Sequence, residues 1–365
     1  MTRMLASVRG PDEAEIALAG GADIIDLKDP SRGALGAVEE SAVRSTVERI
    51  AGRRTVSAVI GDLPLGGRAV DAAEAMAATG VDFVKLGIFP AEDTERAVRA
   101  LAPLARRVRL VAVLPADLSP DLDLVPALAE AGFAGAMLDT ARKDGRRLLD
   151  HVPIPELRRF VASCRAAGLL CGLAGALEPP DIPRLLLLAP DLLGFRGALC
   201  AAGRPEGRAG PIDPSRVALV RGLIPREERA AEIVRQPELV GTDRIFVRDL
   251  VLPVEIGAYA REHGAPQPVR FSVDAWVAGP MRPARDLRDV VSYDLISDGI
   301  RLLVDAGHVE LVETLAERIA SLLLAHPRVA RVRVRLEKLE TGSGIVGVEI
   351  ERAQEATRAA LAVQS

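Results

Sequence analysis

Short apolar runs alternate with amphipathic stretches over the first 222 residues of this 365-residue chain. The runs are rich in β-branched residues, which is typical of strands buried in a parallel sheet. The stretches between them, such as PDEAEIALAGG and AEDTERAVRALAPLARR, have the apolar spacing of helices. We therefore predict eight strands, at residues 4–8, 23–28, 55–61, 83–89, 109–115, 135–141, 169–175 and 192–197.

This alternation predicts an α/β domain, a (β/α)₈ TIM barrel, over residues 1–222. An open doubly wound sheet is the alternative, but no GxGxxG turn follows the first strand. Residues 223–241 are charged and contain two prolines, so we interpret them as a linker with some helical content.

The pattern changes after the linker, over residues 242–353. Strands are expected at 243–259 and 268–279, helices at 291–307 and 312–326, and strands at 329–338 and 345–353. Strands and helices segregated in this way predict a smaller α+β domain with an antiparallel sheet. The last residues, 354–365, are predicted to be a frayed helical tail.

Composition excludes several classes of function. The formal net charge is only −4, and no basic cluster with interleaved aromatic residues suggests a nucleic-acid partner. Acidic residues near the start interrupt any signal-peptide core, and no apolar run is long enough to cross a membrane, so we expect a cytoplasmic protein. The three cysteines have no metal or redox spacing, and we expect buried thiols in a reducing compartment and no metal site.

Lysine is scarce: it accounts for four of the 47 lysine and arginine residues. Arginine replaces lysine well on a solvated surface, but it does not lose its proton or form a Schiff base. The retained lysines are therefore candidates for imine or acid–base chemistry, with chance retention as the alternative.

Three of the four lysines fall where a barrel would carry its chemistry. Lys28 ends the second predicted strand, Lys85 lies within the fourth, and Lys143 follows Asp139 at the end of the sixth. The carboxyl ends of barrel strands meet at the active face. Apolar neighbours would lower the pKa of Lys85, while Asp26 and Asp139 could balance charge and relay protons. A structural layer of lysine–aspartate pairs is the alternative.

Glycines end the last two predicted strands. Gly175 and Gly197 lie where barrels commonly hold a phosphate on backbone N–H groups, and Arg196 or Arg208 could add positive charge. With the lysines, these residues predict a small phosphorylated carbonyl substrate.

The segments GGADIIDLKDPSRGALGA, FVKLGIF, AMLDTARKDGR, GLAGAL and GFRGALC resemble the (5-formylfuran-3-yl)methyl phosphate synthases of methanofuran biosynthesis, over roughly residues 4–215. The resemblance implies that two glyceraldehyde 3-phosphates condense with loss of phosphate and water, without a cofactor. It also implies that Lys28 forms the Schiff base and Lys85 accepts a proton, while Asp139 and Lys143 assist proton transfer and phosphate elimination. A generic Schiff-base sugar-phosphate aldolase is the alternative, and the sequence leaves open which lysine carries the imine.

The C-terminal segments DRIFVRDLVLPVEIGAYAREHGAPQPVRFSVD, VVSYDLI, LVETLAERIA and VRVRLEK resemble dihydroneopterin aldolase, over roughly residues 242–352. The resemblance implies that Glu313 anchors the pterin, that Lys338 is the general acid and base, and that Tyr293 and Glu262 handle protons. A solvated Glu313 and a core Tyr293 are the alternatives. The family also implies ring-shaped homo-oligomers built through this domain, with sites shared between subunits.

One departure concerns the residues after Lys338, where many relatives have proline and this chain has LETG. A non-catalytic oligomerisation module is therefore the alternative for the C-terminal domain. Our main expectation is a bifunctional enzyme of one-carbon carrier biosynthesis, serving methanofuran and a tetrahydromethanopterin-type coenzyme. Its partners would be glyceraldehyde 3-phosphate and a dihydropterin.

Overall fold

The computed structural model divides into two units, Met1–Ile224 and Pro225–Ser365. It describes residues 1–354 apart from Ala34, Leu63, Lys143, 202–209, 226–240, 260–261, 280–283, Arg285 and 341–343. Most of the predicted linker and almost all of the predicted tail therefore lie outside the described residues. No helix within the described ranges is long and apolar enough to cross a membrane.

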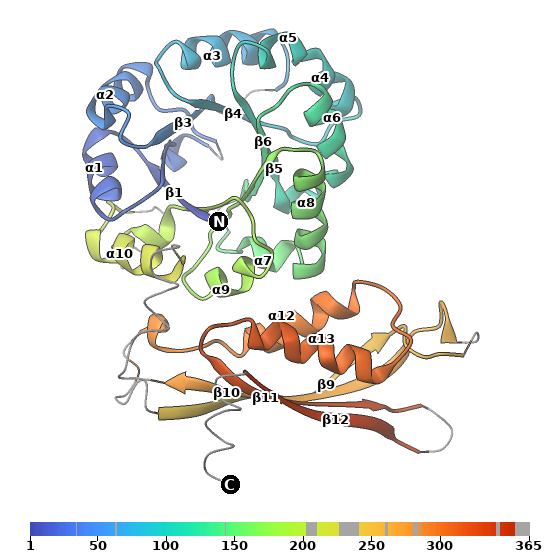
Figure 1. Ribbon diagram of the computed structural model, residues 1–365. Coiled ribbons are helices and arrows are strands. Elements are labelled where there is room, and N and C mark those ends of the chain that lie inside the picture. The colour runs from blue at the N-terminus through green and yellow to red at the C-terminus, as the bar shows by residue number, and fades with distance from the viewer. Residues whose placement is uncertain are drawn as a thin grey trace. The chain divides into compact units, whose positions relative to one another are not determined.

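Eight parallel strands of the first unit close into a barrel ringed by helices (Figure 1). Every predicted barrel strand is confirmed, most of them with bounds shorter by one to three residues. Closure is completed between the first and last strands, where Leu5 pairs with Gly194 on one side and with Ile24 on the other. The strands are β1 (Arg3–Val8), β2 (Ile24–Leu27), β3 (Thr55–Val59), β4 (Phe83–Gly87), β5 (Leu110–Pro115), β6 (Gly135–Asp139), β7 (Leu170–Leu173) and β8 (Leu192–Phe195).

Helices cover the outside of the barrel because each presents one apolar stripe to the strands. In α8, for example, the buried side chains Leu157, Phe160, Val161 and Cys164 recur at helical spacing. The helices are α1 (Pro11–Ala19), α2 (Glu40–Ile50), α3 (Gly67–Ala77), α4 (Thr94–Ala100), α5 (Ala102–Ala105), α6 (Val125–Glu130), α7 (Leu148–His151), α8 (Ile154–Ala166), α9 (Asp181–Leu186) and α10 (Pro214–Leu223). Short 3₁₀ turns are η1 (Pro30–Arg32), η2 (Ala116–Leu118), η3 (Leu122–Leu124) and η4 (Gly197–Leu199).

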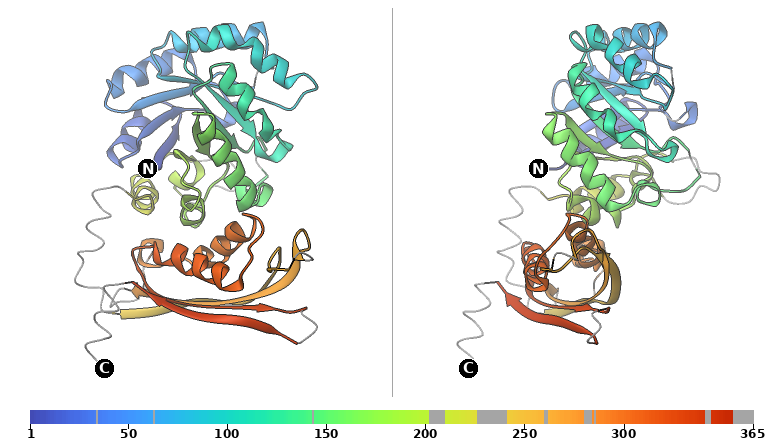
Figure 2. Two further views of the ribbon diagram at one scale, coloured as in Figure 1. Left: turned by 45° about the vertical axis from the view of Figure 1, so that its right-hand side comes forward. Right: turned by 90° about the vertical axis from the view of Figure 1, so that its right-hand side faces the viewer.

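The second unit is a four-stranded antiparallel sheet, in the order β12-β11-β10-β9, with two long helices on one face (Figure 2). Alternate side chains of the two central strands point to those helices: Phe271 pairs with Leu336 and Val273 with Val334, and all four are buried. The elements are β9 (Gly241–Val254), β10 (Gln267–Gly279), η6 (Leu287–Asp289), α12 (Asp294–Val304), α13 (Val312–Leu324), β11 (Val329–Lys338) and β12 (Val346–Ala353). The expected α+β domain is confirmed.

The first strand of this domain ends earlier than predicted. The apolar pattern predicted a strand through residue 259, but β9 ends at Val254. Gly257 adopts a φ of +139°, and Ile256 forms an isolated bridge with Val309 instead of continuing the sheet. The chain therefore turns away from the sheet at this glycine, a conformation that other residues rarely adopt.

Candidate active sites

A cavity of about 470 Å³ opens at the carboxyl ends of the barrel strands. Residues of β1, β2, β4, β6, β7 and β8, or of the loops that follow them, line it. The lining includes Lys28, Lys85, Asp139, Gly175 and Gly197. With Arg196, which also lines the cavity, the face at which TIM barrels hold their active sites therefore brings together six of the residues that the sequence singled out.

Asp26 and Lys85 form a buried pair inside the barrel. Lys85 Nζ lies 2.7 Å from Asp26 Oδ1, and Asp26 is fully buried. The hydroxyl groups of Ser57 and Ser7 donate to the two Asp26 oxygens at 2.6 and 3.0 Å. Three donors therefore satisfy the hydrogen-bonding oxygens of this buried carboxylate. Asp26 is thus positioned to balance the charge of Lys85 from below the cavity.

Lys28 follows β2 directly and reaches across the barrel to the end of β6. Its Nζ donates to Asp139 Oδ2 at 2.7 Å. Burial works to lower the pKa of Lys28, but the charge and hydrogen bond of Asp139, with Asp26 and Asp62, outweigh it and raise the pKa. Lys28 is therefore an ammonium group here, held in that state mainly by Asp139. It must pass a proton to a base before it can act as a nucleophile.

The loops after β7 and β8 bring backbone close to the cavity. Gly175 has a φ of +117°, and a Cβ there would lie 2.9 Å from Thr140 Cγ2. Gly197 begins η4, and a Cβ there would meet nothing within 4 Å. Glycine is thus required by the fold at 175, whereas at 197 it leaves open space beside the cavity.

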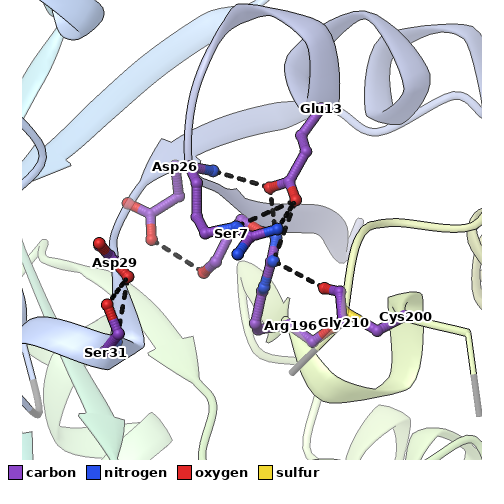
Figure 3. Close-up of polar contacts among 9 residues, drawn as sticks. Ser7, Glu13, Asp26, Asp29, Ser31, Arg196, Cys200 and Gly210 are labelled. Atoms are coloured by element: carbon purple, nitrogen blue, oxygen red, sulfur yellow. Dashed lines mark hydrogen bonds and ion pairs between the residues drawn. The ribbon is translucent and has the colours of Figure 1, made fainter. Parts of the chain in front are cut away.

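Arg196 follows β8, and its guanidinium is held by Glu13 of α1 (Figure 3). Nη1 and Nη2 donate to the two Glu13 oxygens at 2.6 and 3.1 Å, and also to the carbonyl oxygens of Ser7 and Gly210. Burial works to raise the pKa of Glu13, but hydrogen bonds from Arg196 and Arg9 hold it at about 2. Arg196 Nε is buried without a hydrogen-bond partner among the described residues. Glu13 therefore already neutralises much of the positive charge that Arg196 was expected to offer a phosphate. The Arg196 Nε–H remains as a donor without a partner among the described residues.

Lys143, the third barrel lysine, lies outside the described residues, as does Arg208. The three cysteines are buried, and burial raises the pKa of Cys200. Their expected role as small buried hydrophobic residues is confirmed.

Lys338 and Glu262 form the second site, at the end of β11. Lys338 Nζ donates to Glu262 Oε1 at 2.6 Å, and the Tyr259 amide donates to Oε2 at 3.0 Å. These bonds, first of all the one from Lys338, lower the pKa of Glu262 to about 2. The carboxylate lies over Gly257, where a Cβ would be 2.0 Å from Glu262 Oε2. The glycine that ends β9 early is therefore also the one that makes room for Glu262.

Two stacked histidines lie beside this pair. The rings of His263 and His308 are parallel to within 21°, with centroids 4.0 Å apart. His308 Nε2 lies 3.0 Å from the Gly257 carbonyl oxygen, and the Gly257 amide donates to Val309 O. These contacts tie the turn that carries Glu262 to the loop before α13.

Tyr293 and Glu313 are the other two residues that the sequence predicted for the pterin site. Tyr293 is 64% exposed at the start of α12, and Glu313 is exposed in the first turn of α13. Among the described residues, no hydrogen bond joins either of them to Glu262 or Lys338. The structure thus brings together two of the four residues expected at the pterin site.

Sequence reasoning missed four supporting residues. Ser7 and Ser57 are ordinary small polar residues in strands, and only their inward alternation with buried neighbours could have indicated them. Glu13 had a local signal, because it lies in the first turn of the first helix, four residues after Arg9. Gly257 lies inside the segment that the sequence predicted as one strand, residues 243–259.

The fold and the sites define a two-domain enzyme in which lysine–carboxylate pairs occupy both candidate active sites. The sequence profile of the 4-HFC-P synthase family matches residues 4–221, and that of dihydroneopterin aldolase (FolB) matches residues 245–351.

Individual proteins are similar to one region or the other. A Methylorubrum extorquens protein assigned as a (5-formylfuran-3-yl)methyl phosphate synthase is 49% identical, over 59% of this chain and 89% of its own length. The synthase of that name from Methanococcus maripaludis C7 is 37% identical, over 56% of this chain and 93% of its own. The crystal structure of Escherichia coli dihydroneopterin aldolase in complex with neopterin is 33% identical, over 30% of this chain and 99% of that one, with a TM-score of 0.28.

The chain therefore belongs to the 4-HFC-P synthase family: it is a (5-formylfuran-3-yl)methyl phosphate synthase homologue with a C-terminal FolB domain.

Proposed function

We propose that the barrel condenses two molecules of glyceraldehyde 3-phosphate to (5-formylfuran-3-yl)methyl phosphate. The atoms balance when one phosphate and two waters leave. The observation that carries the proposal is the pair of lysines in one cavity, each with its own carboxylate. Condensation of two aldehydes needs an electron sink on one and a base for the other, and an imine-forming lysine supplies the sink.

In this scheme, Lys28 transfers its proton to Asp139 and attacks the aldehyde carbon of one substrate. Water leaves as the imine forms, the protonated imine accepts electrons as the new carbon–carbon bond is made, and hydrolysis of the imine by one water finally releases Lys28. Lys85 passes its own proton to Asp26, and the neutral amine then accepts and returns protons at the reacting carbons. Asp139, with Lys143, protonates the leaving groups. No cofactor takes part in any of these steps.

The phosphate of the substrate would lie against the loops after β7 and β8. The backbone at Gly175 and Gly197 lines the cavity, and Arg196 Nε is a donor without a partner among the described residues. Such N–H groups bind phosphate oxygens without need of a free cation.

Purified full-length protein incubated with glyceraldehyde 3-phosphate tests this function. We expect one phosphate released for each two aldehydes consumed, and a product with the mass of the furan aldehyde phosphate. A generic aldolase would instead give a six-carbon sugar bisphosphate with no phosphate released. That result would replace the proposed reaction by the alternative.

We further propose that the C-terminal domain cleaves the side chain of a dihydroneopterin by a retro-aldol reaction. The Lys338–Glu262 pair supports catalysis rather than scaffolding, since a half-buried acid–base pair at a strand end stays accessible to a substrate and serves no evident packing purpose. The pterin ring accepts the electrons of the broken bond, so Lys338 needs only to move protons. Glu313 would hold the ring through paired hydrogen bonds, with Tyr293 near the side chain.

This site would be completed between two copies of the chain, in a homo-oligomer built through the C-terminal domain. Tyr293 and Glu313 are exposed and not bonded to the Lys338–Glu262 pair, which supports a contribution from a neighbouring subunit. Mixing Lys338→Ala and Glu313→Ala proteins after mild dissociation tests it. Restored pterin cleavage is expected, because hybrid interfaces regain both residues. Two inactive variants that stay inactive when mixed would contradict a shared site.

A further inference from the structure

The segment after β2, with the sequence DPSRGALGA, carries an apolar side chain into the barrel. Leu35 is 4% exposed and packs in a buried cluster with Val59 of β3, Val113 of β5, Met137 of β6 and Ala174 after β7. A loop residue therefore fills interior space that strand residues fill in most barrels.

Three glycines make room for this insertion. A Cβ at Gly33 would lie 2.3 Å from Asp62 Oδ2, and one at Gly36 would lie 2.0 Å from the Asp29 carbonyl oxygen. A Cβ at Gly87, two residues beyond Lys85 in β4, would lie 2.8 Å from Leu35 Cδ1.

The loop is also anchored by hydrogen bonds. The Leu35 amide donates to Asp62 Oδ1 at 2.8 Å, and the Asp29 amide donates to Gly36 O at 2.9 Å. The turn itself begins with Asp29 and Ser31, which are bonded to each other beyond the end of β2 (Figure 3). Both the glycines and the anchors fix where Leu35 lies.

Leu35 lies directly behind one wall of the catalytic cavity. Met137 and Ala174, two of its packing partners, line that cavity. Met137 Sδ is 3.9 Å from Lys85 Nζ. The other partners, Val59 and Val113, belong to β3 and β5, and no described residue of these two strands or of the loops that follow them lines the cavity. Leu35 thus lies between the cavity wall and the side of the barrel formed by β3 and β5.

We propose that Leu35 is a positioning residue that limits the length of the aldehyde substrate. It holds Met137 and Ala174 against the cavity and closes the space toward β3 and β5, so that three-carbon aldehyde phosphates fit and longer ones are rejected. This inference rests on the proposed barrel function and specifies the length of substrate that the barrel accepts. Truncation of Leu35 frees space behind Met137, a flexible side chain that can move into it.

The test compares imine formation with D-glyceraldehyde 3-phosphate and with the longer D-erythrose 4-phosphate. Borohydride traps the imine irreversibly, so the rate of inactivation at a series of aldehyde concentrations gives an efficiency for each. In Leu35→Ala we expect the preference for the three-carbon aldehyde to fall by about tenfold, the discrimination that one or a few methylene groups provide. Leu35→Val should fall between this variant and wild type, and Leu35→Met should retain the wild-type ratio.

Leu157→Ala, at a fully buried position of α8, is the matched control for loss of core packing. It should lower stability without changing the ratio of the two efficiencies. The inference is overturned if the ratio stays at the wild-type value in folded Leu35→Ala or Leu35→Val, or if Leu157→Ala changes it equally. If Leu35→Ala does not fold, the ratio measured for Leu35→Val decides the test. Wild-type protein that forms no imine with glyceraldehyde 3-phosphate would instead overturn the proposed function, and this inference with it.

Discussion

Lys28 Nζ lies 2.7 Å from Asp139 Oδ2, a contact that joins the ends of β2 and β6 across the mouth of the barrel. Lys85 is paired separately, with Asp26. Each lysine therefore has its own carboxylate, and a proton lost by one need not be taken from the other. This separation is what allows two lysines in one cavity to carry different roles.

Asp139→Asn should shift the pH dependence of imine formation to lower pH. Burial alone lowers the pKa of Lys28, and Asp139 is the largest influence that raises it, so its loss lets the pKa fall. Only the neutral amine attacks an aldehyde, and the rate of borohydride inactivation rises as pH passes the pKa of Lys28. A midpoint that stays in place or moves up would contradict the role given to Asp139. Overall turnover should still fall, since Asp139 is also the proposed proton relay.

The sequence predicted the barrel strands because each is a short apolar run buried on both faces. It also placed Lys28, Lys85 and Asp139 at one face, since that follows from strand order alone. It could not tell which carboxylate serves which lysine. Asp26 lies two residues from Lys28 yet pairs with Lys85, because the pairing depends on the curvature of the closed barrel.

Contacts between segments that are distant in the sequence could not be predicted either. Glu13 and Arg196 are separated by 183 residues and meet only because β1 and β8 are neighbours in the closed barrel. The insertion of Leu35 depends on glycines in two different segments. In the C-terminal domain, the first strand is shorter than predicted because the chain turns away from the sheet at Gly257.

Glu13→Gln should destabilise the barrel near neutral pH by about 2–3 kcal/mol. The pKa of Glu13 is about 2 in the folded protein, below its ordinary value of 4.5. Its contribution is therefore fully present above about pH 4.5 and is lost as pH falls toward 2. The difference between variant and wild type should shrink over that range.

Domain-resolved unfolding checks this prediction. The only tryptophan, Trp276, lies in the C-terminal domain, so its fluorescence follows that domain while far-UV circular dichroism follows both. Glu40→Gln is the control, because Glu40 is 52% exposed and lies 3.7 Å from Arg44. Equal effects of the two substitutions would reject a special role for Glu13.

Gly257→Ala should reduce pterin cleavage at least about tenfold while leaving the barrel reaction intact. The new methyl group would displace the Glu262 carboxylate from Lys338. Backbone strain at a φ of +139° adds a stability cost on the order of 1–3 kcal/mol. Gly264→Ala is the matched control, since its φ is +68° but a Cβ there meets nothing. If both variants lose activity equally, strain in the loop explains the loss, and the close approach to Glu262 does not.

Glu313→Ala should weaken pterin binding by about 2 kcal/mol, the effect of losing a charge-assisted contact in a desolvated site. Calorimetric titration with a neopterin measures it. Glu310→Ala, an exposed position just before α13, should bind as wild type does. Unchanged affinity in Glu313→Ala would favour an oligomerisation module over an active aldolase domain.

The most direct test of the lysine scheme is peptide mapping after borohydride treatment in the presence of glyceraldehyde 3-phosphate. We expect the reduced adduct on Lys28 alone, with Lys85 and Lys338 unlabelled even when a pterin is added. The Lys28→Arg protein should fold, form no adduct and lose more than about a thousandfold in phosphate release, because arginine keeps the charge but is not a nucleophile. An adduct on Lys338 or Lys85, or wild-type turnover in Lys28→Arg, would contradict the account.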